Sequence, residues 1–313
     1  MKNIKILVSG TVAYDQIMNF PGYFKDNILP DKIHVLNVSF YVPKSQVSFG
    51  GTAGNIAYNL ALLGTKPTIL ANVGSNFSDY KKWLVKNKID ISEIKIVKDK
   101  NTATAYIITD QADNQITAFQ PGAIVQSYKL NQKILTKDSL AILAPDNVVN
   151  FVSLAKIYRQ KKIDYIFDPG QQVAALSGSQ IKSILVGAKV FISNDYELSL
   201  ALKKTGWSLK QLVGQVEILV TTLGAQGSVI YNQGKKIIIP PAKPKNTCDP
   251  TGAGDAYRAG LIYSLVNNWP LEKVGRFAGL ISVYTVEKYG TQTHRFSWAD
   301  LNKRYRQNFN QSL

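Results

Sequence analysis

A glycine-rich segment that ends in an acidic residue is the clearest chemical pattern in this chain. Residues 249–260 read DPTGAGDAYRAG, and apolar residues recur at helical spacing after them, so we expect a loop that enters a helix. Gly252, Ala253 and Gly254 stand at the start of that helix. Unpaired N–H groups and the positive end of the helix dipole favour an anion there, above all a phosphate. Asp255 is then placed to take the proton of a hydroxyl that attacks a phosphorus atom.

A second glycine motif lies in the first quarter of the chain. Residues 50–64 read GGTAGNIAYNLALLG, and their apolar spacing predicts a helix that stops at Gly64. Gly50 and Gly51 leave room for a ligand against the backbone. Asn55 offers both a donor and an acceptor to a pair of sugar hydroxyls. Taken alone, this second motif is better explained by an ordinary buried helix after a glycine turn, whereas for the first motif a simple tight turn is the weaker alternative.

Together, the two motifs resemble the paired signatures of the ribokinase-like (PfkB) carbohydrate kinase family, and their order along the chain matches. Shorter segments extend the resemblance and are similar to those of bacterial adenosine kinases: SGTVAYD at 9–15, FPGYF at 20–24, ILP at 28–30, LNVSF at 36–40, DPGQQ at 168–172, SNDYE at 193–197 and TTLG at 221–224. The resemblance implies an ATP-dependent kinase that phosphorylates the 5′-hydroxyl of adenosine to give AMP, in purine salvage. A kinase for another nucleoside, a kinase for a free sugar such as ribose or fructose, and a nucleotide sensor without turnover remain alternatives.

The same resemblance implies roles for individual residues. Asp255 is the general base, and the backbone amides of residues 252–254 stabilise charge on the transferring phosphoryl group. Asp15 holds the two vicinal ribose hydroxyls, helped by Asn55. The implied substrate-binding residues are Thr11, Asp15, Gly50, Gly51, Asn55, Phe119 and Gln172. The implied ATP-binding residues are Asn194, Thr222, Gly224 and Gly227, and Glu197 of the Asn-x-x-Glu motif organises Mg²⁺, partly through water.

Aromatic and amide side chains are the candidates to contact the nucleoside base. Phe119 and Phe49 are candidates to flank a planar purine, and Phe119 is preferred because it occupies the expected lid position. Gln171 and Gln172 could add polar contacts. One departure concerns Ala105, where an aromatic residue is expected in the adenosine kinase branch. Tyr106 cannot simply replace it, because neighbouring strand residues face opposite sides of a sheet.

Length, composition and charge narrow the class of protein. The 313 residues suit a single large α/β domain, without an apolar run of about 18 residues that could span a membrane. One cysteine excludes an internal disulfide, and His34 and His294 lack the spacing of metal or triad sites. The net charge of +16 comes from scattered lysines without an RNA-binding pattern, so no nucleic-acid partner is expected. We expect a cytoplasmic enzyme whose partners are adenosine and ATP, with the lid as a candidate surface for a homodimer.

Alternating strand and helix patterns must position these residues. Strands are expected at Lys5–Ser9, Thr68–Val73, Leu140–Ala144, Tyr165–Phe167, Val190–Ser193 and Ile218–Thr222, and helices at Asp146–Gln160, Ser177–Leu185 and Tyr196–Lys203. This alternation predicts a mostly parallel sheet with helices on both faces. Asp15, Asn194 and residues 222–224 follow strands, so they should meet at the carboxyl edge of that sheet.

Two stretches interrupt this alternation. Residues 16–49 and 101–120 alternate polar and apolar side chains without intervening helices, as in Val38–Val42 and Ala105–Ile108. They are predicted to form one small antiparallel sheet. In the resembled family, such a sheet is a lid over the sugar site.

Overall fold

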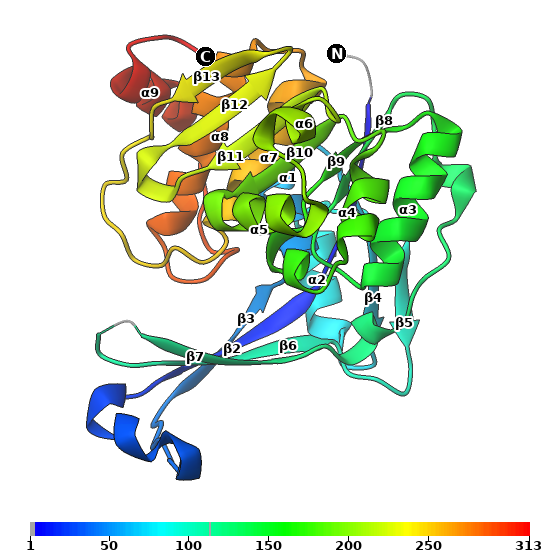
Figure 1. The fold of residues 1–313 in the computed structure, drawn as a ribbon. Coiled ribbons are helices and arrows are strands. Elements are labelled where there is room, and N and C mark those ends of the chain that lie inside the picture. Colours follow the sequence, from blue (N-terminus) through cyan, green and yellow to red (C-terminus); the bar gives the residue numbers. More distant parts are fainter. Residues whose placement is uncertain (1–3, 113) are drawn as a thin grey trace.

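The computed structural model describes residues 4–112 and 114–313, which form two β-sheets and the helices around the larger one (Figure 1). In spatial order, the strands of the large sheet are β13 (Lys235–Ile239), β12 (Ser228–Asn232), β11 (Ile218–Thr222), β10 (Val190–Asn194), β9 (Asp164–Phe167), β8 (Ser139–Leu143), β1 (Lys5–Ser9), β4 (Thr68–Gly74) and β5 (Ile94–Val97). Every neighbouring pair from β11 to β5 is parallel, and β12 and β13 add an antiparallel edge. The mostly parallel sheet predicted from the sequence is confirmed.

Helices cover both faces of the large sheet because its strands are apolar on both sides. In β1, Ile6 and Val8 belong to one buried cluster, and Leu7 between them belongs to another. The first cluster packs under α1 (Thr52–Leu62), α2 (Ser78–Lys86), α7 (Ala253–Val266) and α8 (Leu271–Val286), with α9 (Trp298–Phe309) against α8. The second packs under α3 (Val148–Lys161), α4 (Gly178–Leu185), α5 (Asp195–Thr205) and α6 (Leu209–Val213).

The predicted element bounds are close to the structure. The strands expected at Lys5–Ser9 and Ile218–Thr222 coincide with β1 and β11. Three others differ by one residue at one end, and the strand expected at Leu140–Ala144 differs from β8 by one residue at each end. The helix expected from Asp146 begins two residues later as α3, since the side chain of Asn147 accepts a hydrogen bond from the Val149 N–H and caps it.

The small sheet consists of β3 (Ser45–Gly50), β2 (Ala13–Asn19), β6 (Ala103–Thr109) and β7 (Gln115–Gln120), in that order. It is not fully antiparallel as predicted, because β2 pairs with β6 in parallel. The strand expected at Val38–Val42 is also wrong: that segment has no regular structure, and short 3₁₀ helices occupy Phe24–Asp26 and Pro30–Val35. Alternating apolar residues there therefore do not reflect a sheet face.

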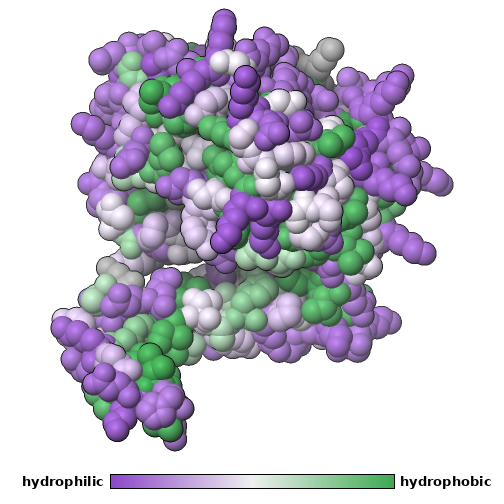
Figure 2. Space-filling model, in the orientation of Figure 1, coloured by the Kyte–Doolittle hydropathy of each residue, from purple (hydrophilic) through white to green (hydrophobic). Residues whose placement is uncertain are grey.

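The segment between β2 and β3 projects from the far end of the small sheet (Figure 1). Figure 2 shows apolar side chains gathered on this projection. Exposed residues there are Leu29, Ile33, Val35, Leu36 and Tyr41. A homodimer through the small sheet stays a prediction, which this exposed apolar surface favours. Within residues 4–112 and 114–313, no helix is long and apolar enough to cross a membrane.

Candidate active site

A cavity of about 850 Å³ lies between the small sheet and the loop that leads into α7. Asp15, Ile17 and Asn19, which share one face of β2, line one side of it. Residues 249–251 and 289–291 line the other side. The structure thus brings Asp15 next to the glycine motif that follows it by more than two hundred positions. We call this space the Asp15 cavity.

Asp15 lies directly against the glycine pair of the second motif. A Cβ atom on Gly50 would lie 2.1 Å from Asp15 Oδ2, so only glycine fits beside this carboxylate. Gly51 follows as the residue before α1, and its φ is 82°. Burial, together with the negative charges of Asp255 and Asp249, raises the pKa of the Asp15 carboxyl to about 7. The charge of Asp255 thus contributes to the raised pKa of Asp15.

The start of α7 has the predicted form. Gly252 is its N-cap residue with φ 78°, and Asp255 lies in the first turn. The Ala253 N–H donates to the Pro250 carbonyl at 3.1 Å. The N–H groups of Gly252 and Gly254 have no hydrogen-bond partner among the residues that the structure describes. Two of the three predicted amides are thus free for an anion at the positive end of the helix.

Asp255 is in contact with the other predicted site helix. Asn55 Nδ2, in α1, donates to Asp255 Oδ2 at 2.8 Å. Burial raises the pKa of the Asp255 carboxyl to about 6, against the opposing effects of Arg258 and of the Asn55 hydrogen bond. A carboxyl with this pKa is mostly ionised at neutral pH and close to the range favoured for a general base.

The residues predicted for ATP and metal lie at the carboxyl ends of β10 and β11. Asn194 pairs with Thr222 in register, and Gly224 and Gly227 belong to the turn after β11. Asn194 and Glu197 form a capping box at the start of α5: Glu197 N donates to Asn194 Oδ1 at 2.7 Å, and Asn194 N donates to Glu197 Oε2 at 2.9 Å. The Asn-x-x-Glu pattern therefore has a structural role in the helix start.

The Asn-x-x-Glu pair also fits a magnesium ion bound through water. In the described part of the chain, no three His, Cys, Asp or Glu side chains are grouped so that they could enclose a metal. Mg²⁺ bound to ATP keeps several waters and needs few protein ligands. Glu197 Oε1 is not used by the helix cap, and burial raises the pKa of this carboxyl while the Asn194 N–H opposes that shift. A nearby divalent ion would favour its ionised form.

Phe119 lies on the same face of the small sheet as Asp15. The register pairs Asp15 with Ala105 and Ala105 with Phe119, so the small Ala105 separates them. Phe119 is about half exposed, whereas Tyr106 lies on the opposite face. Phe49 also lies on that opposite face, where its ring packs 4.6 Å from the Tyr80 ring. The structure therefore separates Phe49 from the predicted base site.

Two other predicted residues are used elsewhere in the fold. Thr11 Oγ1 donates to the Pro145 carbonyl at 2.7 Å. Gln172 lies in the 3₁₀ turn Gly170–Ala174 after β9, and neither residue lines the Asp15 cavity. Their assignment to the substrate stays a prediction.

The comparisons with known proteins agree with this geometry. The sequence profile of the "pfkB family carbohydrate kinase" matches residues 10–297. The chain belongs to the pfkB family of carbohydrate kinases. It is 32% identical over 296 residues to the nucleoside kinase of Methanocaldococcus jannaschii, covering 94% of each chain.

Two solved structures of the nucleoside kinase of Burkholderia thailandensis are similar to this pfkB-family chain over nearly its whole length. The complex with inosine has a TM-score of 0.88 at 34% identity and covers 98% of this chain and 99% of that chain. The complex with ADP-inosine has a TM-score of 0.87 at 35% identity and covers 98% and 97%. The ribokinase-like fold class predicted from the sequence is therefore confirmed.

Sequence reasoning missed a buried cation beside the site of this pfkB chain. Arg258, one turn after Asp255 in α7, donates to Asp168 at the end of β9 through Nε and through Nη2, the latter at 2.6 Å. Both side chains are buried. Coulombic attraction from Arg258 opposes the rise in the pKa of Asp255. A basic residue within an otherwise apolar helix face, and an aspartate directly after a buried strand, were the signals that could have paired them.

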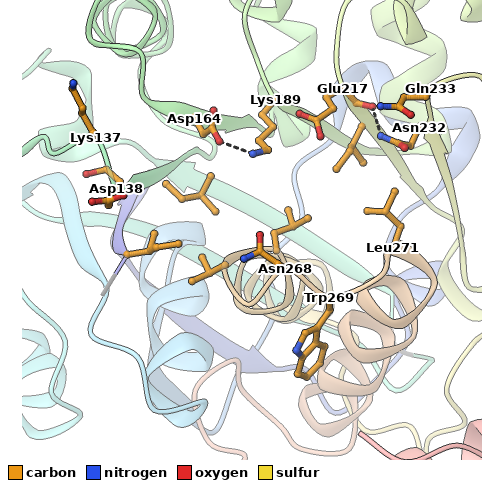
Figure 3. Close-up of a pocket in the computed structure, with 16 residues that line it drawn as sticks. Lys137, Asp138, Asp164, Lys189, Glu217, Asn232, Gln233, Asn268, Trp269 and Leu271 are labelled. Atoms are coloured by element: carbon orange, nitrogen blue, oxygen red, sulfur yellow. Dashed lines mark hydrogen bonds and ion pairs between the residues drawn. The ribbon is translucent and has the colours of Figure 1, made fainter. Parts of the chain in front are cut away.

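A second cavity lies at the opposite, amino-terminal ends of the strands (Figure 3). It has about 520 Å³, and Lys189 Nζ and Asp164 Oδ2 form an ion pair of 2.5 Å at its edge. None of the residues predicted for substrate, ATP or metal lines it. Since ligands of open parallel sheets bind at the carboxyl ends of the strands, the Asp15 cavity is the better candidate for catalysis.

Proposed function

We propose that this protein is an ATP-dependent nucleoside kinase that transfers the terminal phosphoryl group of ATP to the 5′-hydroxyl of a nucleoside. The observation that supports this most strongly is that both carboxylates contact the second glycine motif: Asp15 lies against Gly50, and Asp255 accepts a hydrogen bond from Asn55. One carboxylate can hold a sugar diol while the other receives a proton. The similar proteins from Methanocaldococcus jannaschii and Burkholderia thailandensis, both named nucleoside kinases, support the same substrate class.

Each acceptor-side residue then has a distinct task. The two oxygens of Asp15 accept hydrogen bonds from the 2′- and 3′-hydroxyls, in the pocket that Gly50 leaves open. Asp255 orients the 5′-hydroxyl and removes its proton as the oxygen attacks phosphorus. The free N–H groups of Gly252 and Gly254 stabilise the negative charge on the transferring phosphoryl group.

The donor side lies at the carboxyl ends of β10 and β11. Asn194 and Thr222 are adjacent there, followed by the turn that contains Gly224 and Gly227, and we assign ATP to this edge. Bound Mg²⁺ would neutralise charge on the phosphates, and Glu197 would hold its hydration shell. The small sheet acts as a lid that limits water, which would otherwise compete as phosphoryl acceptor.

We propose adenosine as the first substrate to test, and inosine as the second. A base attached to a ribose held by Asp15 would extend along the face of the small sheet that contains Phe119. Ala105 leaves space above β6 for that base, which makes the departure from the adenosine kinase pattern compatible with nucleoside binding. The inosine complex of the Burkholderia thailandensis enzyme is the reason to include inosine.

A substrate screen tests this proposal. Purified protein is incubated with ATP and Mg²⁺ and with adenosine, inosine, guanosine, cytidine, ribose or fructose, and the phosphorylated product is identified by mass and by NMR. We expect nucleoside 5′-monophosphates, with the highest kcat/KM for a purine nucleoside. A higher kcat/KM for ribose or fructose would replace the proposal by a sugar kinase. No turnover with any of them, despite ATP binding, would favour a nucleotide sensor.

A further inference from the structure

Gln292 is a buried residue outside both sequence motifs that makes three hydrogen bonds around the candidate site. It follows α8 and is 3% exposed. Its Nε2 donates to Asn55 Oδ1 at 3.0 Å and to the Tyr80 hydroxyl at 2.6 Å. Its Oε1 accepts from Trp83 Nε1 at 2.8 Å. Every polar group of this amide is thus used within the protein.

The Trp83 indole, which can only donate a hydrogen bond, sets the direction of these hydrogen bonds. The indole N–H of Trp83 can only donate, so Gln292 must turn its carbonyl oxygen toward Trp83. The amide nitrogen of Gln292 then points toward Asn55, which must present its own carbonyl oxygen. The amide nitrogen of Asn55 is left to face Asp255.

Asn55 therefore meets Asp255 as a donor and not as an acceptor. Its Nδ2 lies 2.8 Å from Asp255 Oδ2, which leaves Oδ1 of this carboxylate for an incoming hydroxyl. If the Asn55 amide were reversed, its oxygen would face the carboxylate and repel it. We propose that Gln292 is a positioning residue that fixes the Asn55 amide and thereby aims the catalytic carboxylate of Asp255; this inference rests on the proposed role of Asp255 as general base.

Gln292 is also connected, through Tyr80, to the part of the site proposed to hold the nucleoside. The Tyr80 hydroxyl, which accepts from Gln292, donates to the Gly50 carbonyl at 2.8 Å. Gly50 is the residue against which Asp15 lies. A Cβ atom on Gly54 would lie 2.0 Å from the Tyr80 hydroxyl oxygen, so glycine at this position of α1 is needed for the contact. One side chain thus connects the surroundings of both carboxylates.

The charged groups around Asp255 come from three elements. Arg258 lies on its own helix, Asp168 at the end of β9, and Asp15 on β2. None of these three side chains is hydrogen-bonded to Gln292 in the described structure. A change at Gln292 therefore reaches Asp255 through Asn55, without removing a charge.

The test compares Gln292→Met with Tyr58→Phe. Met keeps the length of Gln292 and removes its polar groups. Tyr58→Phe is the matched control, since the Tyr58 hydroxyl makes a buried hydrogen bond to the His294 carbonyl, joining the same helix to the same segment without touching Asn55. Two quantities are measured: the pKa of Asp255 by ¹³C NMR of carboxyl-labelled apoprotein, with its signal identified by its loss in Asp255→Asn, and the kcat and KM for nucleoside and ATP.

For Gln292→Met we expect the pKa of Asp255 to rise by about half a unit or more, because the ionised form loses a fixed donor. We also expect kcat to fall about tenfold, the scale of one lost hydrogen bond, with the ATP KM within about twofold of wild type. Tyr58→Phe should change neither quantity. An unchanged Asp255 titration in Gln292→Met, or an equal shift in Tyr58→Phe, overturns the inference.

A second variant covers the case in which Gln292→Met does not fold. Trp83→Phe removes the N–H that sets the direction of the Gln292 amide and leaves Gln292 and Asn55 in place. The same rise in the Asp255 pKa is expected, and its absence in a folded Trp83→Phe overturns the inference. The NMR titration needs no substrate. A wild-type protein that phosphorylates no nucleoside would therefore refute the proposed function separately, while an active wild type with unmoved titrations would refute only the role of Gln292.

Discussion

The guanidinium of Arg258 and the carboxylate of Asp168 form a buried, two-pronged ion pair. The pair connects the second turn of α7 to the end of β9, and so holds in place the helix whose first turn contains Asp255. Planar, paired geometry of this kind is the strongest form of side-chain hydrogen bonding between charges. Removing one partner leaves the other charge buried without compensation.

Arg258→Met should therefore destabilise the protein by about 3–5 kcal/mol, as measured by denaturant unfolding. Lys189→Met is the matched control, because it breaks an ion pair with Asp164 that is partly exposed to solvent. That change should cost less than about 1 kcal/mol. Equal, small losses in the two variants would show that the Arg258 pair does not stabilise α7.

The pKa of Asp15 predicts a pH dependence of nucleoside binding. The carboxyl is protonated below its pKa of about 7, and only the ionised form accepts hydrogen bonds with both oxygens. The nucleoside KM should accordingly fall as the pH rises through 7, and the ATP KM should change little. Steady-state kinetics across this range in wild type and Asp15→Asn provide the measurement. A nucleoside KM with the same pH profile in both proteins would exclude Asp15 as the titrating group.

Stability should change with pH in the opposite sense. The folded-state pKa of Asp15 is raised above its ordinary value of 3.8. The contribution of this carboxyl to the free energy of unfolding is therefore fully present below pH 3.8 and is lost as the pH rises through 7. Asp15→Asn removes this loss. Its gain in melting temperature over wild type should be larger at about pH 8 than at about pH 5.

Phe119 and Tyr106 offer a paired test of base recognition, because they lie on opposite faces of the small sheet. Phe119→Ala should raise the adenosine KM about twofold to tenfold, the range expected for the loss of about 0.5–1.5 kcal/mol of aromatic contact. Tyr106→Ala should leave it unchanged. If ribose is a substrate at all, its KM should respond to neither change. A larger effect from Tyr106→Ala than from Phe119→Ala would contradict the prediction, because it would place the base on the face of the small sheet that contains Tyr106.

Glu197→Gln should raise the Mg²⁺ concentration needed for half-maximal rate and leave nucleoside KM nearly unchanged. The amide keeps an oxygen that can accept the Asn194 N–H, so α5 retains its cap while the charge near the metal's waters is lost. Asp195→Asn, an exposed neighbour in the same turn, is the control for general charge effects and should leave the titration unchanged. Superimposable Mg²⁺ titrations for Glu197→Gln and wild type would remove Glu197 from the metal site.

The alternation of apolar runs with amphipathic segments was enough to predict the large sheet and its helices. Local signals were clear there: buried strands such as β8 consist mostly of apolar residues, and glycine marks the start of α7. The small sheet was harder to predict from the sequence. Its strands come from separate places in the sequence, and nothing local to β2 or β6 indicates that they pair in parallel.

Only part of the candidate site could be predicted, because only some of its residues have a signal in the local sequence. Glycine motifs and residues that follow strands are recognisable from the local sequence, so Asp15 and Asp255 could be proposed together. Contacts between side chains that are distant in the sequence could not be predicted in this way. The position of Phe49 in an aromatic cluster, the Arg258–Asp168 ion pair and the contacts of Gln292 all depend on tertiary packing. Asn55 was predicted as a ligand for the sugar, and the structure adds its hydrogen bond to Asp255.

The central claim is that Asp255 acts as the base of a nucleoside kinase, and one comparison tests it most directly. Wild type and Asp255→Asn are assayed for adenosine 5′-monophosphate formation from adenosine and ATP under identical conditions. We predict that the variant binds adenosine within a few-fold of wild type and turns over roughly a hundredfold more slowly or worse, since asparagine keeps the shape but cannot take the proton. An Asp255→Asn protein that forms the product at the wild-type rate would contradict the account.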